Sequence, residues 1–382
     1  MSLRSVSVVL ALVLVALATP LVRAQPSTAP RVLTIPCKGT VGVQITAKGV
    51  GDALSRAKRQ KIERVIFEID SEGGFVYEAS AIMDVLREHA ETFEMVALVE
   101  GRALSAATVF LAGADAWLVT PGATIGAAVS YSQDDSTGNV DVDAKFNAAW
   151  SSSLAGLAEQ SGWPGDLFRA MVERGVTLYA AFEDGATERA TFSRTWPEDK
   201  PEVKRIDTAE TVLALNASEL VELGLAKAID ESDLEKVATL LEWGDVRTAG
   251  RYGATVMNSA AREREKLSDQ IGGLNEELTW HVEQARQTDP RGADIYYDRD
   301  TMQLTPASQR LWAQKAQVAL GHWTSAERLL KKWAQLDKRA ERAGALHLRV
   351  DHDMADEVYK AVAENVAFLR ANMRKTHHQL EP

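Results

Sequence analysis

The sequence predicts an α/β layered fold followed by an all-α region. Over residues 31–242, short apolar strands alternate with amphipathic helices, and this rhythm is typical of a sheet covered by helices. After about Trp243 the β-branched runs disappear and charged helical patterns replace them. A chain of 382 residues is long enough for two domains. We therefore expect an α/β domain at 31–242 and a helical region at 245–382.

The expected elements of the first domain follow one another in a regular order. Strands are expected over 32–36, 43–46, 65–70, 95–100 and 116–120, and helices over 50–59, 76–89 and 105–112. Two of the strands end in turn-forming pairs, Gly73-Gly74 and Pro121-Gly122.

The second region carries the pattern of paired helices. Its clearest signal is a row of apolar residues at alternating spacings of four and three, Leu267, Ile271, Leu274 and Leu278. Such spacing predicts the seam of a coiled coil or of a helical hairpin. Residues 288–306 are expected to form a loop, and a last helix is expected from about 354 to 369. Aromatic residues such as Trp312, Trp323 and Trp333 are interpreted as core, so no chemistry is assigned here.

Composition excludes several classes of protein. With 46% apolar residues the chain can build a core, which excludes a wholly disordered chain. The balance of 43 basic and 54 acidic residues, a net charge of −11, argues against nucleic acid as the main partner. The single cysteine, Cys37, cannot form an intramolecular disulfide and is expected to be buried.

The N-terminus predicts export. Residues 1–24 combine one arginine in a short n-region, an apolar run over 6–17 and the cleavage-like Val22-Arg23-Ala24. This is the pattern of a signal peptide, so the mature chain is expected in the periplasm or outside the cell. The alternative is an uncleaved segment that anchors the chain to a membrane.

Two strand exits could serve acyl-transfer chemistry. Gly73-Gly74 closes a strand and opens a helix, where backbone amides can turn toward a carbonyl oxygen. The alternative is that Gly73-Gly74 forms an ordinary turn with no role in chemistry. At the next exit, Ser105 begins a helix of small residues, and the amide of Ala106 could donate to an oxyanion. The alternative for Ser105 is an N-cap serine.

A nucleophilic serine needs a base, and histidine is an unsuitable candidate here. His89 is the one histidine of residues 31–242, and its charged neighbours predict a solvated surface, so a Ser-His-Asp triad is not expected. A lysine can serve as base if burial lowers its pKa from about 10.4 toward 7 or 8. Lys145 has apolar neighbours, among them Phe146 and Trp150; its alternative is a surface lysine.

These segments, in this order, resemble the Clp-protease-like branch of the crotonase fold. The likeness is closest to the NfeD-type membrane serine peptidases related to signal peptide peptidase A. It covers residues 32–241 through the segments 69–74, 101–107, 115, 121–128, 145–160, 212–217 and 219–226. Two residues depart from the family pattern: Glu72 replaces a proline before the glycine pair, and Ala107 replaces a glycine after the serine.

The resemblance implies specific roles for these residues. Ser105 would be the nucleophile and Lys145 the base, 145 − 105 = 40 residues apart, close to the family's separation. Gly74 and Ala106 would supply the oxyanion amides, with Gly73 as the alternative to Gly74. The resemblance implies no cofactor. No metal site is expected either, because His347 and His352 are five residues apart, which is off the helical spacing of metal ligands.

The sequence thus predicts an exported serine endopeptidase with a Ser/Lys dyad. Its substrates would be proteins or peptides, and the resemblance implies membrane-associated or hydrophobic segments. A homo-oligomer is expected, the polar segment 183–201 could act as a lid, and the helical region could bind an envelope protein. The alternative is a weakly active or inactive peptidase-like scaffold that binds envelope proteins through residues 245–382. An acyl-CoA crotonase fits an exported chain poorly.

Overall fold

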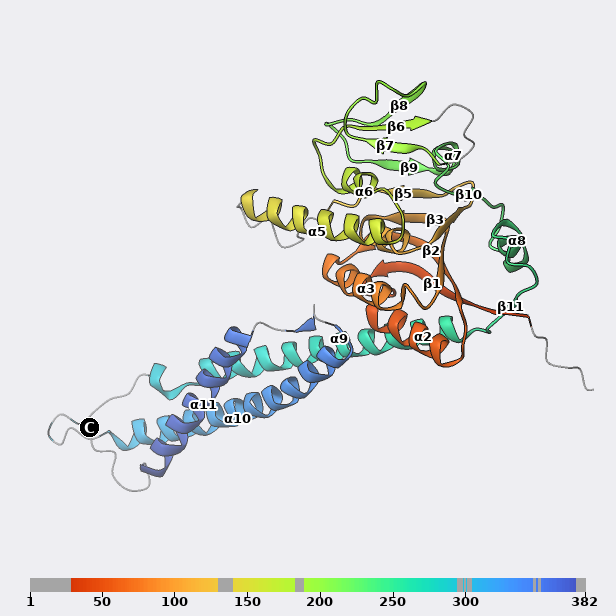
Figure 1. Ribbon diagram of the computed structural model, residues 1–382. Helices are drawn as coiled ribbons and strands as arrows, with labels where there is room; N and C mark the ends of the chain where they lie inside the picture. The colour runs from red at the N-terminus through yellow and green to blue at the C-terminus, as the bar shows by residue number, and fades with distance from the viewer. Residues whose placement is uncertain are drawn as a thin grey trace, which may run out of the picture.

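The computed structural model describes residues 29–129, 140–182, 189–293, 298, 300, 304–345, 348–349 and 352–375. These residues form an α/β body that carries a long helical arm (Figure 1). The signal-peptide prediction for 1–24 lies outside the described residues. Among the described helices, none is both long enough and apolar enough to cross a membrane.

A mostly parallel sheet organises the body. Its strand order is β10-β4-β3-β2-β1-β11, built from β10 (Lys227–Ala228), β4 (Ala116–Val119), β3 (Glu94–Leu104), β2 (Arg64–Gly74), β1 (Arg31–Val41) and β11 (Arg247–Thr248). The carboxyl end of β3 also pairs with β5 (Thr124–Gly126), and β9 (Ala214–Asn216) runs antiparallel to β5. A second, antiparallel sheet has the order β7-β6-β8, with β6 (Leu178–Phe182), β7 (Thr191–Ser193) and β8 (Glu202–Asp207).

Helices cover the two faces of the main sheet unequally. One face packs into the main core against α2 (Ala47–Arg59), α3 (Val76–His89), α4 (Thr108–Ala112), α5 (Val140–Gln160) and α6 (Gly165–Val172). On the other face, α8 (Leu234–Leu240) covers a smaller cluster that includes Val32, Ile66 and Leu98. These three residues lie in the first halves of their strands, so α8 leaves the carboxyl halves on that face uncovered. The short α7 (Ala217–Glu222) follows β9.

Most predicted elements of the body are confirmed, with two corrections. The helix expected over 76–89 is α3, and Cys37 is buried as expected. Burial, and next the charge of Glu68, raise the pKa of the Cys37 thiol well above its usual value, which suits an inert core residue. The strand expected over 43–46 is wrong, because backbone bonds from residues 43–45 to Thr40 O close a turn there. His89 is buried against Phe93 and is not a surface residue.

Three helices form the arm: α9 (Tyr252–Gln287), α10 (Pro306–Arg342) and α11 (His352–Lys375). α9 and α10 run antiparallel as a hairpin, and α11 packs on α10 (Figure 1). Leu267 and Ile271, of the predicted apolar row, are buried against the end of α10. The tryptophans assigned to the core are buried: Trp312, Trp323 and Trp333. Gly272 and Gly273 lie inside α9 without ending it, since tertiary packing outweighs helix propensity.

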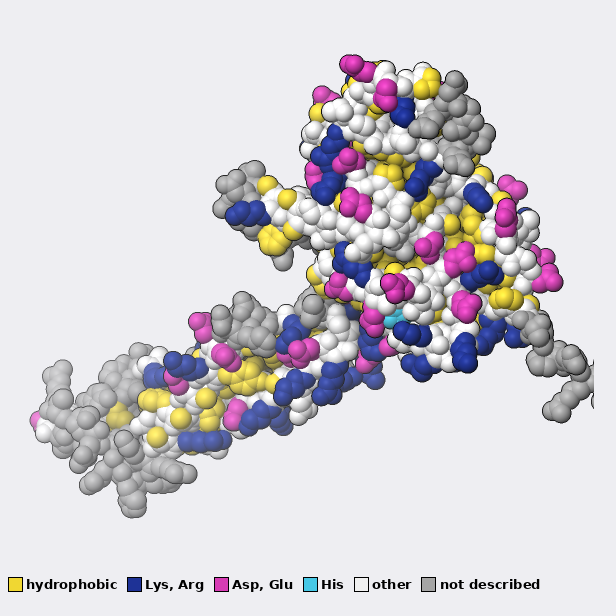
Figure 2. All heavy atoms as spheres, in the orientation of Figure 1, with side chains coloured by type: hydrophobic (Ala, Val, Ile, Leu, Met, Phe, Trp, Pro, Cys, Tyr) yellow, Lys and Arg dark blue, Asp and Glu magenta, His cyan; other side chains and the backbone are white. Residues whose placement is uncertain are grey.

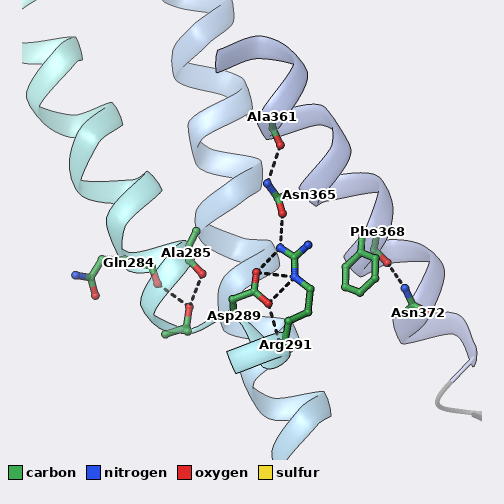
Figure 3. Close-up of polar contacts among 9 residues, drawn as sticks. Gln284, Ala285, Asp289, Arg291, Ala361, Asn365, Phe368 and Asn372 are labelled. Carbon is green, nitrogen blue, oxygen red and sulfur yellow. Dashed lines mark hydrogen bonds and ion pairs between the residues drawn. The ribbon is translucent and has the colours of Figure 1, made fainter. Parts of the chain in front are cut away.

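A short polar network fastens α11 to the far end of the hairpin (Figure 3). The helix α9 is followed by the 3₁₀ turn η2 (Pro290–Gly292). There the Arg291 guanidinium donates to the Asp289 carboxylate and to Asn365 Oδ1 of α11, and it stacks 4.7 Å from the centre of the Phe368 ring. The hydrogen bonds from Arg291 lower the pKa of Asp289.

The arm is continuous with the sheet. Arg247 and Thr248 form β11 beside β1, beyond the boundary that the sequence suggested. The first turns of α9 then pack along the remaining edge of β1. Gly253 permits this approach, because a Cβ there would lie 2.2 Å from Thr34 O.

Candidate active site

Ser105 stands at the carboxyl end of β3, where the chain turns into the 3₁₀ turn η1 (Ser105–Ala107) and α4. Its side chain is half-buried, and its hydroxyl makes no hydrogen bond with any described residue. The N-cap of η1 is Leu104, and no side chain caps the turn. The alternative interpretation, in which the Ser105 side chain caps the helix, is therefore wrong. The Ser105 hydroxyl is available for chemistry.

The backbone of Ser105 is strained. Its φ is +52°, in the left-handed region that costs a non-glycine residue about 1–2 kcal/mol. The neighbours Ala106 and Ala107 are buried, and Thr108 Oγ1 donates to Ser105 O at 2.7 Å, which holds this conformation. A strained serine with a free hydroxyl at a strand exit is typical of a functional site.

The Gly73-Gly74 exit of β2 packs directly against this serine. Both glycines have positive φ, +102° and +152°. A Cβ on Gly73 would lie 2.5 Å from Ser105 Cβ and 3.0 Å from Ala106 N, and one on Gly74 would lie 2.1 Å from Val41 O. The glycine pair is therefore required for close approach to both neighbouring strands.

The Gly73 amide already has a partner. It donates to Ser71 Oγ at 3.1 Å, and Ser71 Oγ donates to Gly39 O at 2.5 Å. Ala106, by contrast, is the second residue of η1, where a helical turn has no acceptor of its own for the N–H. The structure thus brings together Gly73, Ser105 and Ala106, three of the predicted site residues.

Glu72 faces away from Ser105. Alternation along β2 places Ser71 and Gly73 on one side and Glu72 on the other. The Glu72 carboxylate is 72% exposed and pairs with the Arg102 guanidinium. The replacement of the family's proline by Glu72 therefore puts no negative charge at the proposed oxyanion position.

Lys145 lies apart from this group. It occupies an exposed turn of α5, next to Phe146, which is 66% exposed. The second half of α5 is held by buried Trp150 and Leu154, whereas its first half projects beyond the body (Figure 1). Among the described residues, no hydrogen bond or ion pair joins Lys145 to Ser105. The apolar enclosure expected from its neighbours is not formed in the single chain, because Phe146, Ala148 and Ala149 face solvent.

Neither His89 nor Asp115 lies beside Ser105 as a base or third triad member. His89 is at the opposite end of α3 from the glycine pair. Asp115 is at the amino-terminal edge of the sheet, where its Oδ2 accepts from Met95 N at 2.7 Å. Burial raises the pKa of the Asp115 carboxyl above its usual value. Asp115 therefore links β3 and β4 rather than serving the serine.

The structure also shows a charged surface that sequence reasoning missed. On the uncovered carboxyl half of the sheet, Lys38 pairs with Glu100 at 2.5 Å, and Asp70 Oδ1 accepts from Arg102 N at 3.1 Å. The hydrogen bond to Glu100 raises the pKa of Lys38, and burial raises the pKa of Glu68. The sequence indicates this charged surface by placing a charged residue at every second position of β2, as in Glu68, Asp70 and Glu72.

Comparisons with solved structures give matches of low identity. A serine-to-alanine mutant of the 1510-N membrane-bound stomatin-specific protease matches with 16% identity and a TM-score of 0.39, over 58% of this chain and 97% of that chain. A lysine-to-alanine mutant of the same protease, in complex with a substrate peptide, also matches with 16% identity and a TM-score of 0.39, over 59% and 94%. ClpP1 from Listeria monocytogenes matches with 12% identity and a TM-score of 0.35, over 52% and 92%.

Family membership rests on a different comparison. None of the curated proteins compared with the chain matches it. The family model described as NfeD1b, N-terminal domain, matches residues 31–228, a little over half of the chain. This range contains the strained serine, the glycine pair and the sheet that positions them. The chain therefore belongs to the NfeD1b family.

Proposed function

We propose that this protein is an exported serine endopeptidase that uses Ser105 as nucleophile and Lys145 as base. The observation that carries the proposal is the state of Ser105: a free hydroxyl on a strained backbone, packed against Gly73. We assign the activity to the domain at residues 31–242. The resemblance to peptidases that act near membranes favours membrane-associated or hydrophobic segments as substrates.

The chemistry would proceed by acyl transfer. The neutral Lys145 amine takes the proton of Ser105 Oγ as this oxygen attacks a peptide carbonyl carbon. The new C–O bond leaves an oxyanion, which the amides of Gly74 and Ala106 stabilise by about 3 kcal/mol per donor. Collapse of the intermediate expels the amine with a proton from Lys145, and water then hydrolyses the acyl-enzyme. Gly73 is the weaker alternative to Gly74, because Ser71 already accepts from its amide.

The exposure of Lys145 sets a condition on this mechanism. The ammonium must lose its water to act as a base, so the first half of α5 has to be covered. A second copy of the chain could cover it, or an apolar substrate segment packed on Phe146. Both coverings agree with the expected homo-oligomer and with hydrophobic substrates.

A fluorophosphonate probe, which phosphonylates activated serines with loss of fluoride, tests the proposal. The chain from Gln25 is treated with the probe and, separately, incubated with unfolded casein, and both reactions are read by mass spectrometry. Ser105→Ala and Lys145→Ala should abolish labelling and cleavage, whereas the exposed controls Ser153→Ala and Lys236→Ala should retain both. Labelling at another serine, or full labelling in Lys145→Ala, would contradict the dyad.

The exposed position of Lys145 favours a second candidate, a peptidase-like scaffold. In that case the body would hold its fold without catalysis, and the arm would bind an envelope protein. The same experiment separates the two: a scaffold gives neither labelling nor cleavage in the wild-type chain. The variants would then differ from the wild type in neither reaction.

A further inference from the structure

One exposed face of α10 is basic over the last part of the helix, residues 328–342. Its members lie within about one third of the helix circumference, at 3.6 residues per turn. They are Arg328, Lys331, Lys332, Lys338, Arg339 and Arg342, with Arg310 on the same face nearer the start of the helix, and all are exposed. We name this set the basic stripe. Figure 2 shows Lys and Arg side chains gathered along the lower border of the arm and continuing beneath α2.

Only one acidic residue of α10 borders the stripe, and it pairs with Lys331. The other two acidic residues of α10 pair with Arg349 instead: buried Asp337 at 3.2 Å and Glu341 at 3.3 Å. The neutral positions between the cations are Gln314, Gln317, Gly321, Thr324 and Gln335. Such a segregation stands out in a chain whose net charge is −11.

Most of the stripe has no role in the fold. Lys331 pairs with Glu327, and Arg339 donates to Gln270. The other five cations of the stripe form no ion pair with a described residue. The opposite face of α10, including Trp312, Trp323 and Leu330, supplies the core of the arm. The basic face is thus accessible to a partner, whereas the apolar face is buried in the core of the arm.

We propose that the basic stripe docks the arm on an anionic lipid surface. Residues 328–342 span about 21 Å at the helical rise, which gives a straight row of cations for a plane of headgroup phosphates. Because the apolar face is buried in the arm, attachment would be electrostatic, without insertion of α10. The predicted signal peptide or anchor takes the chain to a membrane compartment, where lipid phosphates are abundant and nucleic acid is not.

This proposal goes beyond the proposed peptidase activity and does not depend on it. Docking would hold the body near the membrane surface, where hydrophobic or membrane-proximal substrates are found. It requires only that the stripe attracts anionic headgroups. It is therefore tested by binding, with no catalytic readout.

Vesicle co-sedimentation measures the attachment. The chain from Gln25 contains every described residue and is mixed with vesicles of phosphatidylcholine, with or without roughly one quarter phosphatidylglycerol, at about 50 and about 300 mM NaCl. The stripe variant combines Arg328→Gln, Lys332→Gln, Lys338→Gln and Arg342→Gln. The control variant changes the same charge on the body: Arg174→Gln, Lys204→Gln, Arg205→Gln and Lys236→Gln. Circular dichroism and thermal unfolding verify that both variants fold.

The expected result is binding to the anionic vesicles alone, weakened at least ten-fold by the higher salt. Each cation near such a surface contributes roughly five-fold in affinity, so the stripe variant should bind at least fifty-fold more weakly. The control should remain within two-fold of the wild type. Absence of wild-type binding, or an equal loss in both variants, would overturn the proposal. Equally tight binding of a short DNA duplex would identify a general polyanion site and refute the lipid assignment.

Discussion

Arg264 of α9 and Glu78 of α3 form a buried ion pair that joins the arm to the helix behind the glycine pair. The side chains are 4% and 2% exposed, and Arg264 Nη2 lies 2.9 Å from Glu78 Oε1. Arg264 also donates to Gly42 O at 2.8 Å and to Gly344 O at 2.7 Å. Glu78 accepts from Ala47 N at 2.6 Å. One guanidinium therefore ties α3, the turn at Gly42 and both long helices of the arm to one another.

Removing the cation of this pair should destabilise the whole chain. Arg264→Met leaves the Glu78 carboxylate buried without its counter-charge, at a cost of about 3–5 kcal/mol in the free energy of unfolding. Restoring neutrality with the double variant Arg264→Met/Glu78→Gln should recover much of that loss. Urea unfolding measures both, with the exposed neighbour Arg262→Met as control. A loss below about 1 kcal/mol in the single variant would show that the pair is not essential.

Replacing Ser105 by glycine should stabilise the protein while it removes the nucleophile. Glycine adopts φ of +52° without strain, so the free energy of unfolding should rise by about 1 kcal/mol. The same change at Ser153, inside α5, should lower it by about 0.5–1 kcal/mol. Thermal unfolding compares the two variants. If both substitutions changed the free energy of unfolding in the same direction, the backbone of Ser105 would not be strained.

A methyl group on Gly73 should disrupt the site. In Gly73→Ala the new Cβ would lie 2.5 Å from Ser105 Cβ, and φ of +102° is unfavourable for alanine. We expect a loss of about 2–4 kcal/mol in the free energy of unfolding and loss of probe labelling. Gly122→Ala is the matched control, because its Cβ would meet nothing within 4 Å. Full labelling in Gly73→Ala would show that the strand exit does not position Ser105.

Neutralising Glu72 should leave catalysis intact. Its carboxylate is exposed and pairs with Arg102, away from Ser105. Glu72→Gln should therefore change the labelling rate by less than about two-fold and the free energy of unfolding by less than about 1 kcal/mol, as for other surface pairs. A large increase in the labelling rate would instead mean that Glu72 opposes the oxyanion.

Acid should loosen the tip of the arm. The hydrogen bonds from Arg291 lower the pKa of Asp289, so the folded state favours its ionised form. This contribution to stability is present above the unfolded pKa, near 4, and is lost as pH falls through the folded pKa. Asp289→Asn should lower stability at pH 6 but have little effect at about pH 2. Tryptophan fluorescence during urea unfolding at both pH values measures the difference. A constant effect of the variant across this range would exclude the linkage.

Local pattern was sufficient for most of the expected elements and for part of the site. The 3.6-residue spacing of Ile82 and Leu86 predicted α3, because a helix with one apolar stripe must bury that stripe. Strand exits rich in small residues singled out Gly73 and Ser105 as candidates, and the family resemblance placed them in one site. The surface position expected for His89 was wrong. Charged sequence neighbours indicate that part of a helix is exposed, but they do not show what packs against the histidine itself.

The sequence by itself determined the α/β body, the helical region, the serine at a strand exit and the glycine pair beside it. Only the tertiary structure decided that Glu72 points away from Ser105, that Lys145 is exposed, and that Arg264 ties the arm to Glu78. The physical reason is that side-chain periodicity and turn chemistry are local, whereas burial and charge pairing depend on segments far apart in the chain. Glu78 and Arg264 are 186 residues apart, and no local pattern specifies their contact.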